Sequence, residues 1–266
     1  MTAAAPVPAV APDRVARAAA LLIEARRTGQ PLAALPDEAR PRNAGEAYAV
    51  QDAIVAGLGK PVGGWKVGAP TPLAEPAYAP ILDEAIYASP AAVPATQHRV
   101  FGIEAEIAFR MARDLPPRDD GDRPYTQAEI VRAVEAIYPA IEIVESRFST
   151  YPRGDKLSLL ADHQSNGAFV YGPPVRTWGH LDLVRPPALV SIDDRIEGKM
   201  TNGNAGGDPL RLVTALANHL AARTGGLKEG DFVTTGSVTP LVNARPGAVV
   251  TVEFRGMNKI RVTFTK

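Results

Sequence analysis

The sequence predicts an α+β protein that combines a mixed β-sheet core with a helical N-terminal part. Two observations predict this class. Apolar residues recur at helical spacing in the first part of the chain, whereas short runs of alternating or branched apolar residues dominate after residue 60. A few helical patterns are interspersed among these later strands. We therefore expect a helical N-terminal part over residues 1–60 and a β-rich domain over residues 61–266.

The composition of the 266 residues is that of an ordinary globular protein, with 45% hydrophobic and 22% charged residues. The 29 basic and 29 acidic residues balance, so no basic surface is available for a phosphate backbone and we expect no nucleic-acid partner. The absence of cysteine excludes disulfides and thiolate ligands. Apolar runs are too short for a membrane span, and the N-terminus lacks a signal-peptide pattern, so we expect a cytoplasmic protein with no membrane association.

Two helices are predicted in the N-terminal part. Asp13 is a candidate N-cap for the first, and Asn43 is a candidate N-cap for the second. Gly59 follows the last apolar position of the second helix, where glycine commonly ends a helix. The apolar positions that line these helices are Val15, Ala19, Leu22 and Ile23 in the first and Ala47, Val50, Ile54 and Leu58 in the second.

Two further helices are predicted among the strands. Thr126 and Glu129 form a capping box ahead of an apolar pattern, and we expect this helix to continue until Pro139 stops it. Asp208 followed by Pro209 places an N-cap residue before proline in the first helical position.

The strands are predicted from short apolar runs bounded by glycine, proline or aspartate. One hairpin is expected to turn around Asp193, Asp194 and Arg195, since aspartate favours turns. The remaining strands are expected within 64–68, 100–111, 140–148, 165–172, 230–238, 247–254 and 258–264.

The segment "VFGIEAEIAFRM" at 100–111 carries two acids on one face of a strand. Glu104 and Glu106 are two residues apart, so both side chains leave the same side of the sheet. Gly102 and Ala108 flank them and would leave room for a ligand. Two neighbouring carboxylates repel each other unless a positive charge or water lies between them. A solvent-facing sheet edge is therefore one interpretation, and a cation site is the other.

A third acid favours the cation site. Glu142 lies between Ile141 and Ile143, and a carboxylate buried in so apolar a run requires a partner. Three oxygen donors, with no cysteine and no histidine cluster, suit a hard divalent cation such as Mg²⁺ or Mn²⁺. The 36 residues between Glu106 and Glu142 leave their proximity open at this point.

Five ordered motifs resemble the 2-keto-4-pentenoate hydratase and 4-oxalocrotonate decarboxylase family, within the fumarylacetoacetate hydrolase superfamily. They are "GWKVG" at 64–68, "GIEAEIAF" at 102–109, "AIEIVESR" at 140–147, "ADHQSNGAFVYG" at 161–172 and "GDFVTTGSVTP" at 230–240. The resemblance covers nearly the whole chain. It implies a β-roll core of the fumarylacetoacetate-hydrolase type, a helical N-terminal part, a bound Mg²⁺ or Mn²⁺ and an oligomeric protein.

The resemblance also implies roles for particular residues of this chain. The metal ligands would be Glu104, Glu106 and Glu142, and Lys66 would supply a positive charge to the substrate carboxylate or oxyanion. The loop and late-strand motifs correspond to Asp162, Ser165 and Gly167 and to Gly236, Ser237 and Thr239. Ser165 and Thr239 are candidate hydroxyl donors to the substrate. His163, where asparagine is common in the family, is either an alternative acid–base group or a hydrogen-bonded loop histidine.

The implied chemistry is that of a small 2-oxo acid, whose carboxylate and keto oxygens can chelate one cation. Stabilisation of the enolate would allow hydration of a 2-hydroxypenta-2,4-dienoate. The same stabilisation serves a decarboxylase or a carbon–carbon hydrolase of a related 2-oxo acid, and these two reactions are the enzymatic alternatives.

One departure from the family pattern separates these alternatives. The family usually carries an acid shortly after the lysine as a proton-transfer partner, and here Ala77 stands at that position, with Ala79 where glycine is usual. Asp83 or Glu84 would have to substitute, or the reaction differs. A third interpretation is a catalytically impaired subunit, since Ala77 cannot relay a proton. A homo-oligomer is expected, and a heteromer with a homologous decarboxylase is the other assembly considered.

Overall fold

The computed structural model of the chain describes residues 12–118 and 123–266. The protein divides into two compact units. The first unit comprises Met1–Pro61 together with Ser146–Ser165, and the second comprises Val62–Glu145 and Asn166–Lys266. The first unit therefore takes a segment from the middle of the chain as well as its N-terminal part.

The first unit is helical, as its sequence pattern predicts. Asn43 caps α2 by accepting a hydrogen bond from the backbone N–H of Glu46, and Gly59 ends the helix with a positive φ of 61°. The helix α1 begins at Pro12, so Asp13 lies in its first turn and not at the cap. Leu22, Val50 and other apolar residues of these helices form one buried cluster. The elements are α1 (Pro12–Thr28), α2 (Ala44–Leu58), α4 (Lys156–Ala161) and η3 (His163–Ser165).

The second unit is built on two mixed sheets, which confirms the predicted α+β class. The larger sheet has eight strands: β1 (Val62–Gly68), β2 (Ala77–Leu82), β3 (Ile86–Ala88), β5 (Gly102–Met111), β6 (Val134–Val144), β7 (Asn166–Tyr171), β10 (Phe232–Ser237) and β11 (Val242–Asn243). The smaller sheet contains β4 (Ala91–Pro94), β8 (Ala188–Ile192), β9 (Arg195–Lys199), β12 (Val249–Phe254) and β13 (Ile260–Thr265).

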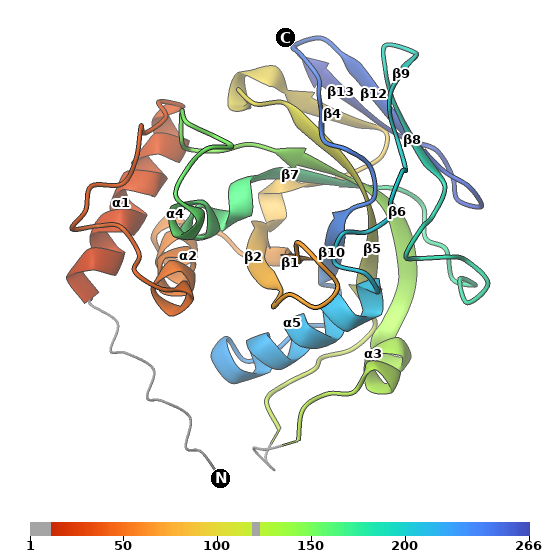
Figure 1. The fold of residues 1–266 in the computed structure, drawn as a ribbon, viewed down its shortest axis with the longest axis horizontal. Helices are drawn as coiled ribbons and strands as arrows, with labels where there is room; N and C mark the ends of the chain where they lie inside the picture. The colour runs from red at the N-terminus through yellow and green to blue at the C-terminus, as the bar shows by residue number, and fades with distance from the viewer. Residues whose placement is uncertain (1–11, 119–122) are drawn as a thin grey trace. The chain divides into compact units, whose positions relative to one another are not determined.

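The order of strands in the larger sheet places β5 and β6 at its centre. That order is β2-β1-β10-β5-β6-β7-β3, and β11 also pairs with β5. Figure 1 shows β5 and β6 side by side, flanked by β10 and β7. The pairs β1–β10 and β3–β7 are parallel, and the others are antiparallel. Neighbouring positions on β1, β10, β5 and β6 can therefore contribute side chains to one face.

The helices and short turns of the second unit surround these sheets. They are α3 (Gln127–Ala133), α5 (Pro209–Arg223), η1 (Asp83–Ala85) and η2 (Ala95–Gln97). Asp208 caps α5 and Pro209 occupies its first turn, as predicted. The α5 helix packs against β1 and β10. Across residues 12–118 and 123–266, every helix is too short or too polar to cross a lipid bilayer.

The predicted third helix is wrong at its C-terminal end. The capping box of Thr126 and Glu129 is present, but α3 ends at Ala133 and β6 begins at Val134. Pro139 lies inside β6, opposite Ile107 of β5. Pairing with β5 on one side and β7 on the other stabilises the extended backbone, and this tertiary pairing outweighs the local helical spacing of the apolar residues. The predicted strand at 140–148 is correspondingly shorter at its end, since β6 stops at Val144.

The predicted hairpin is confirmed. β8 and β9 pair in antiparallel fashion, and Ile192 lies opposite Arg195. The two residues between them, Asp193 and Asp194, have positive φ angles of 49° and 64°. Such angles belong to the two-residue turns that match the twist of a hairpin, and aspartate tolerates them better than most residues do.

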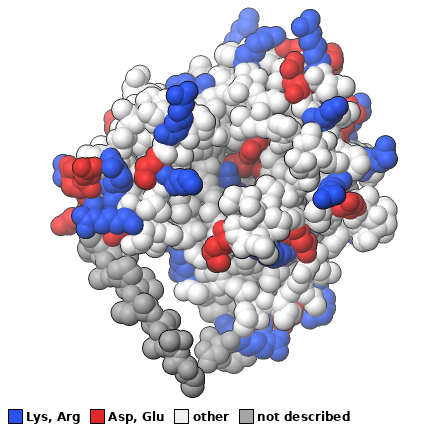
Figure 2. All heavy atoms as spheres, viewed as in Figure 1, with Lys and Arg blue, Asp and Glu red and all other residues white. Residues whose placement is uncertain are grey.

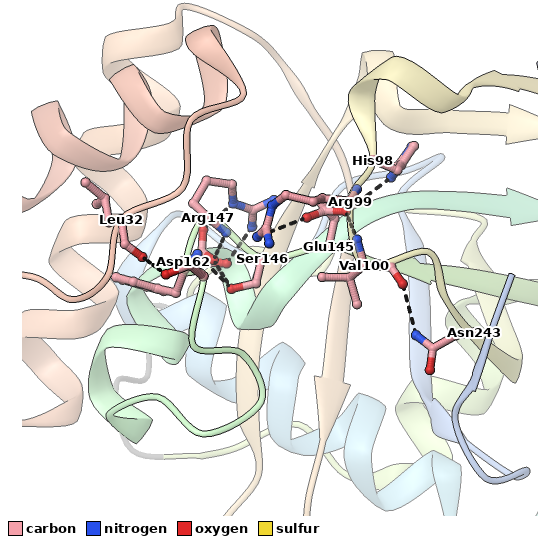
Figure 3. A network of polar contacts seen from close by, with 11 residues as sticks. Leu32, His98, Arg99, Val100, Glu145, Ser146, Arg147, Asp162 and Asn243 are labelled. Carbon is pink, nitrogen blue, oxygen red and sulfur yellow. Dashed lines mark hydrogen bonds and ion pairs between the residues drawn. The ribbon is translucent and has the colours of Figure 1, made fainter. Parts of the chain in front are cut away.

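The entry of the chain into β5 is held by Glu145. Its carboxylate accepts hydrogen bonds from the backbone N–H groups of Arg99 and Val100, the latter at 2.8 Å, and Figure 3 shows these groups around Glu145. The carbonyl of Val100 accepts in turn from the amide of Asn243. The next residue, Phe101, has a φ of 51°, which is costly for an aromatic residue. These contacts fix where β5 starts.

The charged surface is mixed. Figure 2 shows lysine and arginine interspersed with aspartate and glutamate over the visible described residues. This mixture is what 29 basic and 29 acidic residues predict. Exposed pairs of opposite charge, such as Arg27 with Glu24, contribute to it.

Candidate metal centre

The pairing of β5 with β6 brings the three predicted carboxylates together. Glu104 lies directly opposite Glu142, and Glu106 lies two positions further along β5 on the same face. One carboxylate oxygen from each of the three lies within 4.8 Å of the others. Side chains separated by up to 38 positions in sequence therefore converge on one point.

The cluster is largely removed from water. Glu142 has no exposed surface and Glu106 is 1% exposed, whereas Glu104 is partly buried. Buried carboxylates are costly unless hydrogen bonds or opposite charges compensate for the lost hydration. The surroundings of each carboxylate therefore decide what the cluster can hold.

Lys66 supplies the opposite charge. Its ammonium group, which is partly buried, forms an ion pair with Oε1 of the fully buried Glu142. The amide of Asn166, at the start of β7, donates to the same oxygen at 3.1 Å. The other oxygen of Glu142, Oε2, is buried and has no hydrogen-bond partner among the described residues. A buried carboxylate oxygen without a donor is the kind of atom that a cation satisfies.

Glu106 is held in a similar way by β10. Its Oε2 accepts from the hydroxyl of Thr234 and, at 3.1 Å, from the backbone N–H of Gly236. Gly236 has a φ of 89°, a conformation that favours glycine and that turns this N–H toward the carboxylate. No described hydrogen bond involves Oε1 of Glu106 within residues 12–118 and 123–266.

Burial and mutual repulsion shift the acidity of these groups. Burial, and then the charge of Glu142, raise the pKa of Glu104 to about 7. The same two causes raise the pKa of Glu106 well above its ordinary value. Burial alone would lower the pKa of Lys66, but the three glutamates outweigh it and the net shift is upward. One lysine therefore does not neutralise three carboxylates, and a second positive charge would stabilise them.

These observations fit a hard divalent cation. The donors are carboxylate oxygens only, which is the ligand type that Mg²⁺ and Mn²⁺ prefer. The buried Oε2 of Glu142 has no hydrogen-bond partner among the described residues, so a bound cation could satisfy it. The residues that would hold the cation are Glu104, Glu106 and Glu142.

The neighbouring small residues do not provide the space that the sequence predicted. A side chain added to Gly102 would meet Val144 at 2.9 Å, so this glycine allows β5 and Val144 to pack closely. Ala108 is fully buried in an apolar cluster with Tyr138 and Phe232. Both positions are filled by the protein itself because β5 is covered by neighbouring side chains on this face.

Ala77 and Ala79, which stand at the acid and glycine positions of the family pattern, lie on β2, the strand that pairs with the strand of Lys66. Ala79 is paired with Lys66 across β2 and β1, and Ala77 is paired with Gly68, so both share the face of Lys66. An acid at position 77 would therefore face the same side as the glutamates. Asp83 and Glu84 are exposed in η1, beyond the end of β2.

Thr239 is placed next to the acidic strand. Its hydroxyl accepts a hydrogen bond from the backbone N–H of Ala105, the residue between the two glutamates, at 3.4 Å. The N–H of Val238 donates to the carbonyl of Ala105 at 2.9 Å. The loop after β10 is thereby attached to β5. Its contact with a substrate stays a prediction.

His163 and Ser165 belong to the first unit, and their assignment as catalytic residues stays a prediction. Both are buried, and with Gln164 they form three consecutive residues with positive φ. The preceding Asp162 forms a buried ion pair with Arg147, which also donates its backbone N–H to that carboxylate at 2.9 Å (Figure 3). This pair holds the two ends of the segment 147–162 together.

Two polar residues of the cluster were missed by the sequence interpretation. Thr234 and Asn166 each donate to a carboxylate of the cluster. Both residues lie within the family-like motifs at 230–240 and 161–172. A threonine inside a strand and an asparagine at the start of one are common, so neither residue type indicates a functional role. Only the pairing of β10 with β5 and of β6 with β7 gives them this position.

Comparison with known proteins places this geometry in a family. The model of the fumarylacetoacetate (FAA) hydrolase C-terminal family matches residues 64–265. The 2-keto-4-pentenoate hydratase of Paraburkholderia xenovorans (strain LB400) is 30% identical over 95% of this chain and 96% of its own. A 4-oxalocrotonate decarboxylase from Pseudomonas putida is 28% identical over 61% of this chain and 59% of its own.

A solved structure shares the fold. The 4-oxalocrotonate decarboxylase from Pseudomonas putida G7, complexed with magnesium and adipate, superposes with a TM-score of 0.83. It is 22% identical, and the match covers 96% of this chain and 99% of that one. The region matched by the family model, residues 64–265, contains all three glutamates and Lys66. The chain therefore belongs to the fumarylacetoacetate hydrolase family, within the group that resembles 2-keto-4-pentenoate hydratases.

Proposed function

We propose that this protein is a divalent-metal-dependent hydratase that adds water to a small unsaturated 2-oxo acid such as 2-hydroxypenta-2,4-dienoate. The supporting observation is the convergence of Glu104, Glu106 and Glu142 within 4.8 Å of one another, beside Lys66. The partnerless buried oxygen of Glu142 supports the presence of a cation in the working protein. The relative from Paraburkholderia xenovorans supports the reaction type, because it is named a hydratase and the match covers nearly the whole of both chains.

The residues of the site have distinct tasks in this proposal. The three glutamates would hold Mg²⁺ or Mn²⁺, which supplies Lewis-acid stabilisation of the negative charge that develops at the keto oxygen of the substrate. Lys66 would attract the carboxylate of the incoming 2-oxo acid by its charge. Because Lys66 is partly buried beside Glu142, its charge is less screened by water than that of an exposed lysine, and electrostatic attraction is stronger.

A second candidate reaction is decarboxylation of a related 2-oxo acid. Ala77 favours it, because the position where the family carries an acid offers only a methyl group on the face of Lys66. Loss of CO₂ from a 2-oxo acid would use the same stabilised enolate. It would not need an acid at that position to transfer a proton during the addition of water. Cleavage of a carbon–carbon bond in an acylpyruvate is a third reaction of this kind.

A candidate of a different class is a catalytically impaired subunit that binds metal and a homologous partner. The same Ala77 supports it. We also propose that the chain forms homo-oligomers, with a heteromer containing a homologous decarboxylase as the other assembly. The cytoplasmic location and both assemblies remain proposals that rest on the sequence.

One assay with the full-length chain separates these functions. The purified protein, loaded with Mn²⁺, is mixed with 2-hydroxypenta-2,4-dienoate and, separately, with 4-oxalocrotonate. Loss of the diene absorbance without release of CO₂ supports hydration, and release of CO₂ supports decarboxylation. No turnover of either compound, together with tight Mn²⁺ binding, contradicts the hydratase proposal and supports the impaired subunit.

A further inference from the structure

We propose that Thr234 and Asn166 are positioning residues that restrict Glu106 and Glu142 to one ligand oxygen each. By this restriction the site would prefer a small octahedral cation, Mg²⁺ or Mn²⁺, over Ca²⁺. The inference rests on the proposed function because it takes a divalent cation to occupy the cluster. It extends that function by naming the residues that set the identity of the cation.

Glu106 is held through one of its two carboxylate oxygens. Both described donors to this side chain, the hydroxyl of Thr234 and the backbone N–H of Gly236, bind the same oxygen, Oε2. Two donors on one oxygen fix the plane of the carboxylate and leave Oε1 as the oxygen that can serve as a ligand. The side chain is 1% exposed, so water does not compete with Thr234 for this hydrogen bond.

Glu142 repeats the pattern on the neighbouring strand. Lys66 and Asn166 both donate to Oε1. The other oxygen, Oε2, is buried without a hydrogen-bond partner among the described residues. The two fully buried carboxylates of the cluster therefore each have one doubly held oxygen, and the donors come from β10 in one case and from β1 and β7 in the other.

Ligand counting links this pattern to cation choice. Mg²⁺ requires nearly ideal octahedral coordination, whereas Ca²⁺ takes six to eight oxygens and commonly binds carboxylates through both oxygens. If Glu104 also offered one oxygen, the three glutamates would leave room for further oxygen ligands, such as those of a 2-oxo acid and water, on a small octahedral cation. A carboxylate whose second oxygen is already engaged cannot rotate to bind Ca²⁺ through both oxygens without losing its donors.

The chain offers a matched control for Thr234. Thr235, the next residue, is equally buried, with 0% exposure for both. Its hydroxyl donates at 2.8 Å to the backbone carbonyl of Ile107 and touches no carboxylate of the cluster. Replacing either threonine by valine removes one buried hydroxyl and keeps the shape. Only the change at Thr234 removes a donor from a proposed metal ligand.

The experiment measures metal affinity in the full-length protein. Dissociation constants for Mn²⁺ are measured by calorimetry and by the electron paramagnetic resonance signal of free Mn²⁺, and those for Ca²⁺ by competition. Thr234→Val is expected to weaken Mn²⁺ binding by about 10- to 100-fold, as is typical when a residue that orients a metal ligand is removed. Thr234→Ser restores the hydroxyl and is expected to stay within about threefold of the wild type.

The preference for Mn²⁺ over Ca²⁺ distinguishes a positioning role from a purely structural role, because a general loss of packing would not change it. The preference for Mn²⁺ over Ca²⁺ is expected to fall in Thr234→Val, because the freed carboxylate can then bind Ca²⁺ with both oxygens. It is expected to be unchanged in Thr235→Val. Asn166→Leu tests the same effect at Glu142, so the proposal can be tested even if a Thr234 variant does not fold. Circular dichroism checks the folding of every variant.

The outcomes are distinguishable. If the wild-type protein does not bind Mn²⁺, the proposed function itself is contradicted. If the wild type binds Mn²⁺ but Thr234→Val and Asn166→Leu bind it equally well and with the same preference over Ca²⁺, only the positioning roles are overturned. An equal loss of affinity in Thr234→Val and Thr235→Val would also overturn them, because it would show a general effect of losing a buried hydroxyl.

Discussion

Lys66 and the fully buried Glu142 form an ion pair although 76 positions separate them in the sequence. Their strands, β1 and β6, are not neighbours in the sheet, because β10 and β5 lie between them. The two side chains meet because paired positions on β1, β10, β5 and β6 share one face of the sheet. This face gathers a lysine and three glutamates, of which Glu106 and Glu142 are almost completely buried.

Removal of one carboxylate charge is expected to weaken metal binding. Glu106→Gln should lower Mn²⁺ affinity at least about tenfold, because a neutral amide replaces a charged ligand oxygen. Calorimetric titration measures the effect. Glu197→Gln, a change at an exposed acid of β9, is the control and should bind Mn²⁺ like the wild type. Unchanged affinity in Glu106→Gln would contradict the ligand assignment.

Removal of the lysine charge is expected to affect the substrate more than the metal. Lys66→Met should raise KM for the 2-oxo acid, because the charge that attracts its carboxylate is lost. Its Mn²⁺ affinity should change little, because losing a positive charge beside the cluster and losing a donor to Glu142 act in opposite directions. Without metal the variant should be less stable by about 3 kcal/mol, the cost of leaving a buried carboxylate without its partner. Urea unfolding with and without Mn²⁺ measures this. A Lys66→Met variant that loses metal binding would show that the lysine acts on the cation and not on the substrate.

Restoring the acid of the family pattern tests the role of Ala77. Ala77→Asp would place a carboxylate on the face of Lys66, and hydration of 2-hydroxypenta-2,4-dienoate should accelerate at least about tenfold if proton transfer limits the rate. Ala77→Asn has a similar size and cannot exchange a proton in this way, so it is the control. Equal rates in both variants would mean that the missing acid does not limit hydration in this protein.

His219 is expected to make stability depend on pH. It is partly buried on α5, stacked on Tyr78 with ring centres 4.4 Å apart, and burial followed by the charge of Arg223 lowers its pKa to about 4. Between pH 6.5 and 4, His219 binds a proton in the unfolded chain but stays neutral in the folded protein. Stability from this group is therefore complete above pH 6.5 and is lost as the pH falls toward 4.

The measurement compares unfolding free energies of the wild type and His219→Phe across this range. In His219→Phe, the unfolding free energy should fall less steeply as the pH is lowered than it does in the wild type. The difference in slope should correspond to less than one bound proton, because solvent screens a partly exposed ring. Asp231 has the opposite sign, since burial raises its pKa to about 6 and the folded state takes up its proton as the pH falls from 6 to 3.8. Asp231→Asn should therefore steepen the loss on acidification. Parallel curves for all three proteins would contradict both assignments.

The carboxylate of Glu145 is expected to be necessary for the start of β5. Glu145→Ala removes the acceptor of two backbone N–H groups, and a loss of about 2–4 kcal/mol in unfolding free energy should follow. Glu145→Gln keeps a carbonyl oxygen as acceptor and should lose less. Chemical denaturation of both variants measures the difference, and an equal loss in both would show that the charge matters more than the acceptor.

The sequence by itself determined the elements whose signals are local. Asn43 with Gly59, Asp208 with Pro209, and the aspartates at 193 and 194 act through their own backbone and nearest neighbours, so their helices and turn appear where the pattern predicts. These helix ends and the turn depend on interactions between residues a few positions apart. The ordered motifs also indicated the family and pointed to the three glutamates, whose convergence required the pairing of β5 with β6.

Tertiary structure alone decided what depends on distant strands. It extended β6 through Pro139, because pairing with β5 and β7 outweighs a local helical pattern. It filled the space beside Gly102 and Ala108, and it brought Thr234 and Asn166 onto the carboxylates. It also joined the segment Ser146–Ser165 to the N-terminal helices. The physical reason is common to all of these: sheet register and burial set which side chains share a face, and neither is encoded in any single stretch of the chain.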